Sequence, residues 1–407
     1  MSKLAKFSSM DMISDLPQSI IDIILTKLPI KDAVRTSVLS SKWRYQWTTM
    51  TELVFDEKCL SLCDDKKVAE KEFVDFIMRF LMLHNAPIQK FKLSTSYLKK
   101  STDIDQWLRV ISRTDIKEVV LDVYGKEWEW DNPRLSIPRS IFTFRKLTRL
   151  TLSAFTVKPP FGFQGYPCLK YLELDGVTIG LEVIEKFISG CPLLEKFKFI
   201  NIMDKLALTI RAPNLKHLTV AGNFKDLYLE HTPLVAAISI DFCPVVWRGD
   251  ILRKVPFTYD YLESIEIRKM DFKDLDKVLY VLHLLLQSPN LKELQISSPD
   301  LEEHYIYYSG EDDPGHYKNA DFDIWERKCP ADFTFKHLKT VKLAHISTQN
   351  DKEFVRFVLG RSPVLEVISI SPDYEYGEAM KMVNEVLRFP RASLKVNINF
   401  FDEAPYL

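Results

Sequence analysis

Short runs of alternating apolar and polar residues recur along most of the chain. In each run an apolar residue is followed three positions later by a second and five positions later by a third, and most intervals between runs are about 20 to 30 residues. The clear runs begin at Leu147, Leu169, Leu194, Leu215, Val235, Leu262, Leu291, Leu338 and Leu365, and weaker ones at Met50, Ile88 and Ile116. Alternation with a period of two predicts short strands with one buried side.

A second regularity marks where these strands begin. A proline stands two residues before the first apolar position in six runs, at Pro167, Pro192, Pro213, Pro233, Pro289 and Pro363. Proline lacks an N–H group and disfavours helix in the residue before it, so we expect a helix to end there. Apolar residues at helical spacing precede several of these prolines, over residues 183–188, 275–286 and 354–359. The predicted repeating unit is therefore helix, turn and short strand.

A unit of this kind cannot bury its apolar side alone, and stacking on its neighbours produces a continuous core. The interval matches leucine-rich repeats. We therefore predict an α/β protein, a leucine-rich-repeat solenoid of alternating helices and short parallel strands. The asparagine ladder of the extracellular consensus is absent and the chain has only 12 glycines, so the repeats are expected to be irregular and of the intracellular, helix-containing type.

The residues between the apolar positions of each strand are predicted to face outward and to form a surface for a target protein. Those that we expect to contact the target are Arg149, Tyr171, Glu173, Lys196, Lys198, His217, Glu266, Glu293, Gln295 and Lys342. The alternative for any single one of them is a solvated surface residue without a binding role.

Residues 14–47 do not follow the repeat. Apolar residues between Ile20 and Leu28 share one side of a predicted helix that begins near Pro17. A second short helix is expected over residues 31–38, and a third, with Ser40 as its N-cap, carries two tryptophans on one side. Three helices in about 35 residues bury too little surface to be stable alone, so this segment is expected to leave apolar area for a partner.

This segment resembles an F-box. The matching elements are Leu16-Pro17, paired aliphatic residues, Leu28-Pro29, Val34, Ser37-Val38-Leu39-Ser40 and Trp43-Arg44 followed by Trp47. The resemblance implies binding to the Skp-type adaptor of a cullin–RING ubiquitin ligase, through Leu16, Pro17, Ile20, Ile24, Leu28, Pro29, Val34 and Leu39. The alternative for several residues of the segment is that they only hold the three helices together, especially Ile21, Leu25 and Trp43.

The C-terminal residues 329–407 resemble the FBD module of many plant F-box proteins. The matching stretches are residues 335–341, 353–359, 362–366 and 387–393. Physically this part is predicted to be two more strand–helix units and a terminal cap. The resemblances span nearly the whole chain and imply a substrate-recognition subunit of a Skp–cullin–F-box ubiquitin ligase. The alternative is a leucine-rich-repeat interaction scaffold without a ligase role.

The predicted organisation has a flexible N-terminus at residues 1–10, the F-box at 11–50, the repeats at 51–328 and the FBD module at 329–407. An acidic, tyrosine-rich insertion loop at about 298–327 interrupts the repeats. Its aspartates and two histidines suggest a metal site, but they match the ligand spacing of neither an EF-hand nor a zinc motif, so a solvated loop is the favoured interpretation.

Composition narrows the partner classes. The net charge is −1 and the sequence pI is about 6.7, and no basic stripe is present, so a nucleic-acid partner is not expected. The longest apolar stretch, residues 278–286, is too short to span a bilayer, and no secretory signal is recognised at the N-terminus. Six cysteines are scattered without a CxxC pair. An intracellular protein of the nucleus, the cytoplasm or both is therefore expected.

Catalytic motifs are also missing from the sequence. It contains no GxSxG, no HExxH, no P-loop and no GxGxxG, and its eight histidines have neither metal-ligand nor triad spacing. We therefore expect no catalytic residue, no metal and no cofactor.

Overall fold

The computed structural model describes residues 13, 16–59, 66–96, 98, 100–123, 134–242, 258–299, 321–373 and 376–401. The chain forms two compact units, Met1–Leu169 and Lys170–Leu407. This division falls inside the predicted repeat region and not at its ends. The predicted flexible N-terminus, residues 1–10, lies outside the described residues.

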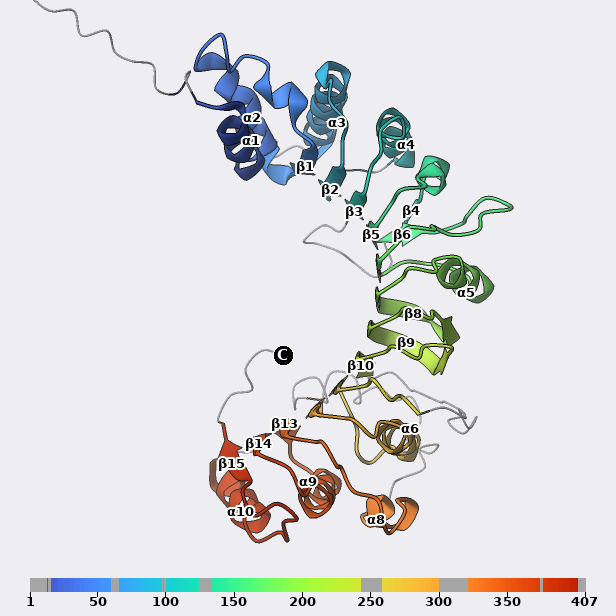
Figure 1. Cartoon of the computed structure of the whole chain (residues 1–407), viewed down its shortest axis with the longest axis vertical. Coiled ribbons are helices and arrows are strands. Elements are labelled where there is room, and N and C mark those ends of the chain that lie inside the picture. The colour runs from blue at the N-terminus through green and yellow to red at the C-terminus, as the bar shows by residue number, and fades with distance from the viewer. Residues whose placement is uncertain are drawn as a thin grey trace, which may run out of the picture. The chain divides into compact units, whose positions relative to one another are not determined.

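The first unit contains a parallel sheet with helices beside it. Strands β1, β2, β3 and β5 pair in that order, and β4 pairs with β6. In Figure 1 helices α3 and α4 lie on the same side of β1 to β3. The elements are α1 (Gln18–Lys27), α2 (Ile30–Arg35), η1 (Thr36–Val38), η2 (Gln46–Thr49), β1 (Glu52–Asp56), η3 (Glu57–Cys59), α3 (Lys66–Leu83), β2 (Lys90–Ser94), α4 (Ser101–Ile111), β3 (Glu118–Asp122), β4 (Leu135–Ser136), η4 (Arg139–Thr143), β5 (Arg149–Ser153) and β6 (Phe155–Thr156).

The second unit continues the same principle. Strands β7 to β15 pair parallel to one another in chain order. The elements are β7 (Tyr171–Asp175), α5 (Leu181–Ser189), β8 (Lys196–Arg211), β9 (His217–Glu230), β10 (Ala237–Phe242), β11 (Ser264–Arg268), α6 (Leu275–Leu286), β12 (Glu293–Ser297), α8 (Ile324–Lys328), β13 (Thr340–Ile346), α9 (Gln349–Arg361), β14 (Val367–Pro372), α10 (Tyr376–Val386) and β15 (Asn397–Phe400). Parallel strands alternating with helices confirm the predicted fold class.

The six prolines occupy one structural position. Each is the second residue of a turn whose first carbonyl accepts a hydrogen bond from the N–H of the first apolar residue of the run, two residues before the strand. In one example the Leu194 N–H donates to the Cys191 carbonyl at 3.1 Å, and in another the Leu291 N–H donates to the Ser288 carbonyl at 3.3 Å. A fixed φ near −65° suits proline at this position. The prolines therefore help to start each strand so that equivalent positions of every run face the core.

The helix–turn–strand unit is not maintained everywhere. No helix separates β8 from β9 or β9 from β10, where short strands alternating with helices were predicted. Instead β8 and β9 extend to 16 and 14 residues. The reason is a second alternating stretch in each strand, in which Leu208 and Ile210 of β8 and Leu227 and Leu229 of β9 are buried. Period-two alternation favours strand over helix.

Gly222 lies where β8 bulges against β9. Its φ is +118°, and a Cβ placed on it would come within 2.4 Å of the Ile202 backbone nitrogen. The register of the two strands shifts on both sides of the Ile202–Gly222 pair. Because the obstacle is backbone, the neighbouring strand cannot move aside without losing sheet hydrogen bonds.

We therefore expect Gly222→Ala to lower the free energy of unfolding by about 2–3 kcal/mol, measured by chemical denaturation. Gly360, in helix α9, is the matched control because no atom lies within 4 Å of its Cβ position. Gly360→Ala should raise stability by about 0.5–1 kcal/mol through its helix propensity. Equal effects from the two substitutions would contradict this account of the bulge.

Part of the predicted insertion loop is helical. Residues 300–320, with both of its histidines, lie outside the described residues, but Ile324–Lys328 form α8. Trp325 is only 2% exposed and its ring centroid lies 4.7 Å from that of Phe354 and 5.6 Å from that of Phe357. These contacts place the end of the predicted loop in the core between α8 and α9.

Candidate protein-interaction surfaces

The N-terminal module, residues 16–50, has its own small core. Ile21, Leu25 and Trp43 are 0%, 1% and 1% exposed. Ile21 and Leu25 are four residues apart and therefore share one side of α1. The helix lies between two prolines, Pro17 and Pro29, that exclude its continuation in either direction. The interpretation that Ile21, Leu25 and Trp43 hold the module together agrees with their burial.

The third helix predicted for this module is replaced by turns. Residues 41–45 form turns that lead into the 3-10 helix η2. The Thr48 and Thr49 hydroxyls donate to the carbonyls of Tyr45 and Gln46, at 2.7 and 2.8 Å. Threonine hydroxyls compete in this way with regular helix, and the three-residue spacing suits the tighter 3-10 geometry. The prediction of an α-helix here was wrong, although both tryptophans are buried.

Two side chains attach the start of the module to its end. The Trp43 indole N–H donates to the Ile13 carbonyl at 3.1 Å, and the Lys42 ammonium donates to the Leu16 carbonyl at 2.9 Å. Helix α1 and η1 both pack against η2. The segments on either side of α1 are therefore fixed to one small body.

Large aliphatic side chains that this core does not use remain at the surface. Ile20, Ile23, Val38 and Leu39 are 41%, 56%, 86% and 52% exposed, and we call these four the exposed aliphatic set. Burying one such side chain fully contributes about 1.5–3 kcal/mol. A module of this size that leaves four of them in water gains substantially from a partner that covers them.

None of the eight residues predicted to face an adaptor is buried. Pro17, Ile20, Pro29 and Leu39 are exposed, and Leu16, Ile24, Leu28 and Val34 are half-buried. The sequence prediction missed Ile23 and Val38, the two most exposed members of the aliphatic set. For Ile23 a signal was present, because it lies two residues from Ile21 and from Leu25, about 200° around the helix. Val38 gave no such signal, since it ends a 3-10 turn.

In the second unit the sheet register aligns the predicted target-binding residues in two rows, which we call the strand-face rows. The first row contains Tyr171, Lys196, His217, Ala237, Ser264, Glu293 and Thr340. The second row contains Glu173, Lys198, Thr219, Ser239, Glu266, Gln295 and Lys342. None of these residues is buried. Paired strands lie about 4.8 Å apart, so neighbours along a row are within reach of one ligand.

Charge is divided along these rows. Lys196 and Lys198 on β8 have no ion pair among the described residues, whereas β11 and β12 carry Glu266 and Glu293. Burial first, and then the nearby Lys196 and Lys216, lower the pKa of His217, which therefore adds no full charge at neutral pH. Strand β8 is therefore a cationic position within the rows, next to Glu173 of β7, and β11–β12 carry two carboxylates next to Lys342 of β13, although Arg268 lies 2.6 Å from Glu266.

Arg149, the remaining predicted target-binding residue, lies in the first unit within a row of ion pairs. Lys90 lies 3.9 Å from Glu52 and 3.4 Å from Glu118, and Arg149 lies 3.6 Å from Glu118. The four side chains follow one another across β1, β2, β3 and β5 with alternating sign. Because this row satisfies its own charges, it is a weaker candidate for an ionic contact with a target than the β8 lysines.

Metal-binding clusters, reactive thiols and membrane-spanning helices were also sought in the part of the chain that the structure describes. Within that part no cluster of three or more His, Cys, Asp or Glu residues is placed to hold a metal ion. Cys59 is a free thiol, and burial raises its pKa to about 11, so it is protonated and weakly nucleophilic at neutral pH. None of the helices seen there has the length and apolar character needed to cross a membrane.

Comparison with known proteins adds independent information. A family model described as the F-box domain matches residues 13–54, and a model of the LRR repeats of the FBD-associated F-box protein At5g56370 matches residues 104–245. The F-box/FBD/LRR-repeat protein At1g13570 of Arabidopsis thaliana is 41% identical over 97% of this chain and 99% of its own length. The F-box/FBD/LRR-repeat protein At1g13780 of the same plant is 34% identical over 53% of this chain and 48% of its own length.

Proposed function

Because the chain belongs to the F-box/FBD/LRR-repeat protein family, we propose that it is the substrate-recognition subunit of a Skp–cullin–F-box ubiquitin ligase. The F-box binds the Skp-type adaptor, and the repeats bind a protein to be ubiquitinated. The observation that carries this proposal is the exposed aliphatic set. Ile23 and Val38 are more than half exposed although buried Ile21 and Leu25 already supply a core for the module.

The chain itself contributes binding and no chemistry in this proposal. Adaptor and target are held by burial of apolar side chains and by charge complementarity, which need no nucleophile, metal or cofactor. The two lysines of β8 and the carboxylates of β11 and β12 favour a target segment with an acidic group opposite β8 and a basic group opposite β11–β12. Such complementarity raises association rates and selects orientation more than it raises affinity.

Co-expression with a Skp-type adaptor tests the ligase part of the proposal. We expect a stoichiometric complex in size-exclusion chromatography with light scattering. If the purified chain is folded but forms no complex, the alternative applies, namely a leucine-rich-repeat interaction scaffold without a ligase role.

The target surface is tested by charge reversal on β8. We expect Lys196→Glu combined with Lys198→Glu to remove the proteins, other than the adaptor and its ligase partners, that proximity labelling captures with the wild-type chain under proteasome inhibition, because the charge of the β8 position in the rows is inverted. Adaptor binding should stay unchanged. The control is Lys292→Glu combined with Lys339→Glu, which changes the net charge equally at residues that directly precede strands β12 and β13. This control variant should still capture the target proteins. Equal loss with both pairs would contradict a specific role for the β8 lysines.

A further inference from the structure

A pocket of about 590 Å³ is formed by helices α9 and α10 and the turn that follows α10. Its lining includes Arg356 of α9 and Lys381, Asn384 and Arg388 from α10 and its continuation. It shares no residue with the exposed aliphatic set or the strand-face rows. The pocket therefore requires a separate explanation.

The spacing of the lining residues explains why they meet. Lys381, Asn384, Glu385 and Arg388 are separated by three, four and seven positions and so share one side of the helix. The Arg388 N–H donates to the Glu385 carbonyl at 3.0 Å, which continues the helical turn past Val386. That side faces the pocket together with Arg356 of α9.

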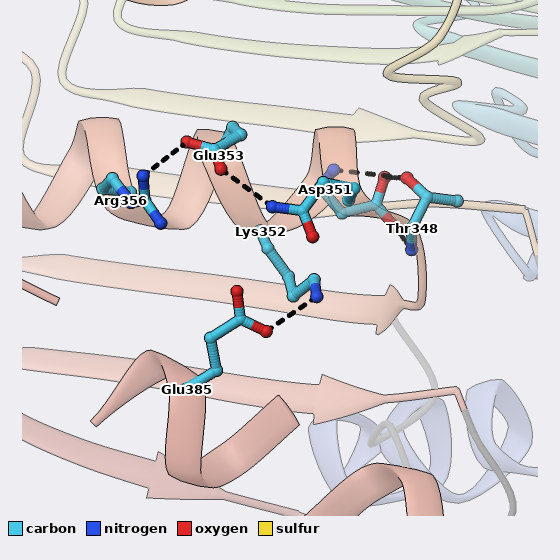
Figure 2. A network of polar contacts seen from close by, with 7 residues as sticks. Thr348, Asp351, Lys352, Glu353, Arg356 and Glu385 are labelled. Atoms are coloured by element: carbon cyan, nitrogen blue, oxygen red, sulfur yellow. Dashed lines mark hydrogen bonds and ion pairs between the residues drawn. The ribbon is translucent and has the colours of Figure 1, made fainter. Parts of the chain in front are cut away.

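The lining carries an excess of positive charge. It contains three cations, Arg356, Lys381 and Arg388, and one carboxylate, Glu385, which gives a net charge of 3 − 1 = +2. The Glu385 carboxylate already accepts a hydrogen bond from the Lys352 ammonium at 2.7 Å (Figure 2). Within the described residues Lys381 and Arg388 have no ion pair.

The cation on α9 is held in position. The Arg356 guanidinium carbon lies 4.6 Å from the centroid of the Phe389 ring, a cation–π distance, and one guanidinium nitrogen lies 3.2 Å from the Glu353 carboxylate (Figure 2). Phe389 is only 6% exposed, so its ring is a fixed support. At the start of α9, Thr348 and Asp351 form a capping box that anchors the helix (Figure 2).

We propose that this pocket binds a phosphate monoester. The phosphoryl group carries about −1.5 to −2 charges at neutral pH, which matches the net charge of the lining. Two guanidinium groups donate paired hydrogen bonds to phosphate oxygens, and the Lys381 ammonium supplies a further charge. Pro390, which also lines the pocket, gives an apolar contact for the group that carries the phosphate. A single carboxylate would leave one positive charge of the pocket unmatched.

Titration of the full chain with phenyl phosphate, followed by 31P NMR, tests the proposal. We expect saturable binding, and phenyl sulfate, a monoanion of similar shape without phosphorus, should compete for the site with an affinity at least tenfold weaker. Binding should strengthen between pH 5 and pH 7, because the second ionisation of the phosphate lies near pH 6 and lysine and arginine remain charged throughout. Absence of binding, or equal binding of the sulfate, would overturn the proposal.

Two double variants test whether phenyl phosphate binds in this pocket. Lys381→Ala combined with Arg388→Ala should weaken phenyl phosphate binding at least tenfold. Lys292→Ala combined with Lys339→Ala removes the same charge from residues paired with Glu263 and Glu366, outside the pocket, and should leave binding within twofold of wild type. If both pairs weaken binding equally, bulk charge is responsible and the assigned site is wrong. The thermal unfolding midpoint of each variant reports whether it is folded.

Two sources of the ligand are separated by a second probe. A short alanine peptide that contains phosphothreonine should bind with at least the affinity of phenyl phosphate if the phosphate is carried by a protein. If only phenyl phosphate binds, the phosphate belongs to a free small molecule. Both results support recognition of a phosphate monoester. Because the pocket lies outside the F-box, these results do not depend on whether the chain binds a Skp-type adaptor.

Discussion

Ile23→Asp is expected to weaken binding of a Skp-type adaptor by about a hundredfold without unfolding the chain. Ile23 is 56% exposed in the chain alone, so the substitution removes little of the intramolecular core. Full burial of an aliphatic side chain is worth about 1.5–3 kcal/mol, and the change forfeits roughly half of this in the complex, because the rest of Ile23 is already covered, and adds the cost of desolvating a carboxylate. Since 1.4 kcal/mol corresponds to a factor of ten, a total near 2.8 kcal/mol gives about a hundredfold. The dissociation constant is measured by isothermal titration calorimetry with purified adaptor.

The control uses the same substitution on another exposed aliphatic residue of the first unit. Leu83, the last residue of α3, is 62% exposed and lies outside the N-terminal module. Leu83→Asp should bind the adaptor with wild-type affinity. If Ile23→Asp also binds like wild type, the exposed aliphatic set is not the adaptor surface. Ile21→Asp is unsuitable as a test, because Ile21 is completely buried and the change would unfold the module.

Trp325→Ala is expected to lower the free energy of unfolding by about 3–5 kcal/mol, the range for truncating a large buried aromatic side chain. The Trp325 ring packs against Phe354 and Phe357 of α9 and its centroid lies 6.2 Å from that of Phe272. Alanine would leave a cavity between α8 and α9 and would remove three aromatic contacts. Urea denaturation followed by far-UV circular dichroism measures the loss.

Phe322 supplies the comparison for this prediction. It precedes α8 by two residues and is 59% exposed, so Phe322→Ala should change stability by less than about 0.5 kcal/mol. Trp325→Phe should restore part of the loss, because a smaller ring still fills part of the space. If Trp325→Ala lowered the free energy of unfolding as little as Phe322→Ala, α8 would not be part of the core of the second unit.

The sequence alone determined the elements whose pattern is local. The strands follow from the three-point apolar pattern, and their starting points from the prolines that begin each turn. Helices α5, α6 and α9 follow from apolar residues at helical spacing. Burial of Ile21, Leu25 and Trp43 was likewise weighed from spacing within the N-terminal module. These features can be predicted from sequence because residues two to four positions apart lie on the same side of a strand or helix.

Only the tertiary structure decided features that depend on residues far apart in the chain. Helix α8 lies in a segment that reads as a polar loop, and it is positioned by rings of Phe272, Phe354 and Phe357. The η2 turn replaces a predicted helix because hydroxyls of Thr48 and Thr49 bond to nearby carbonyls, and it places the Trp47 ring against Phe80 of α3. Register likewise aligns Lys196 with His217, and packing of α10 on α9 brings Arg388 near Arg356. Spacing along the chain specifies which side of an element is apolar, but the partner of that side is chosen by packing.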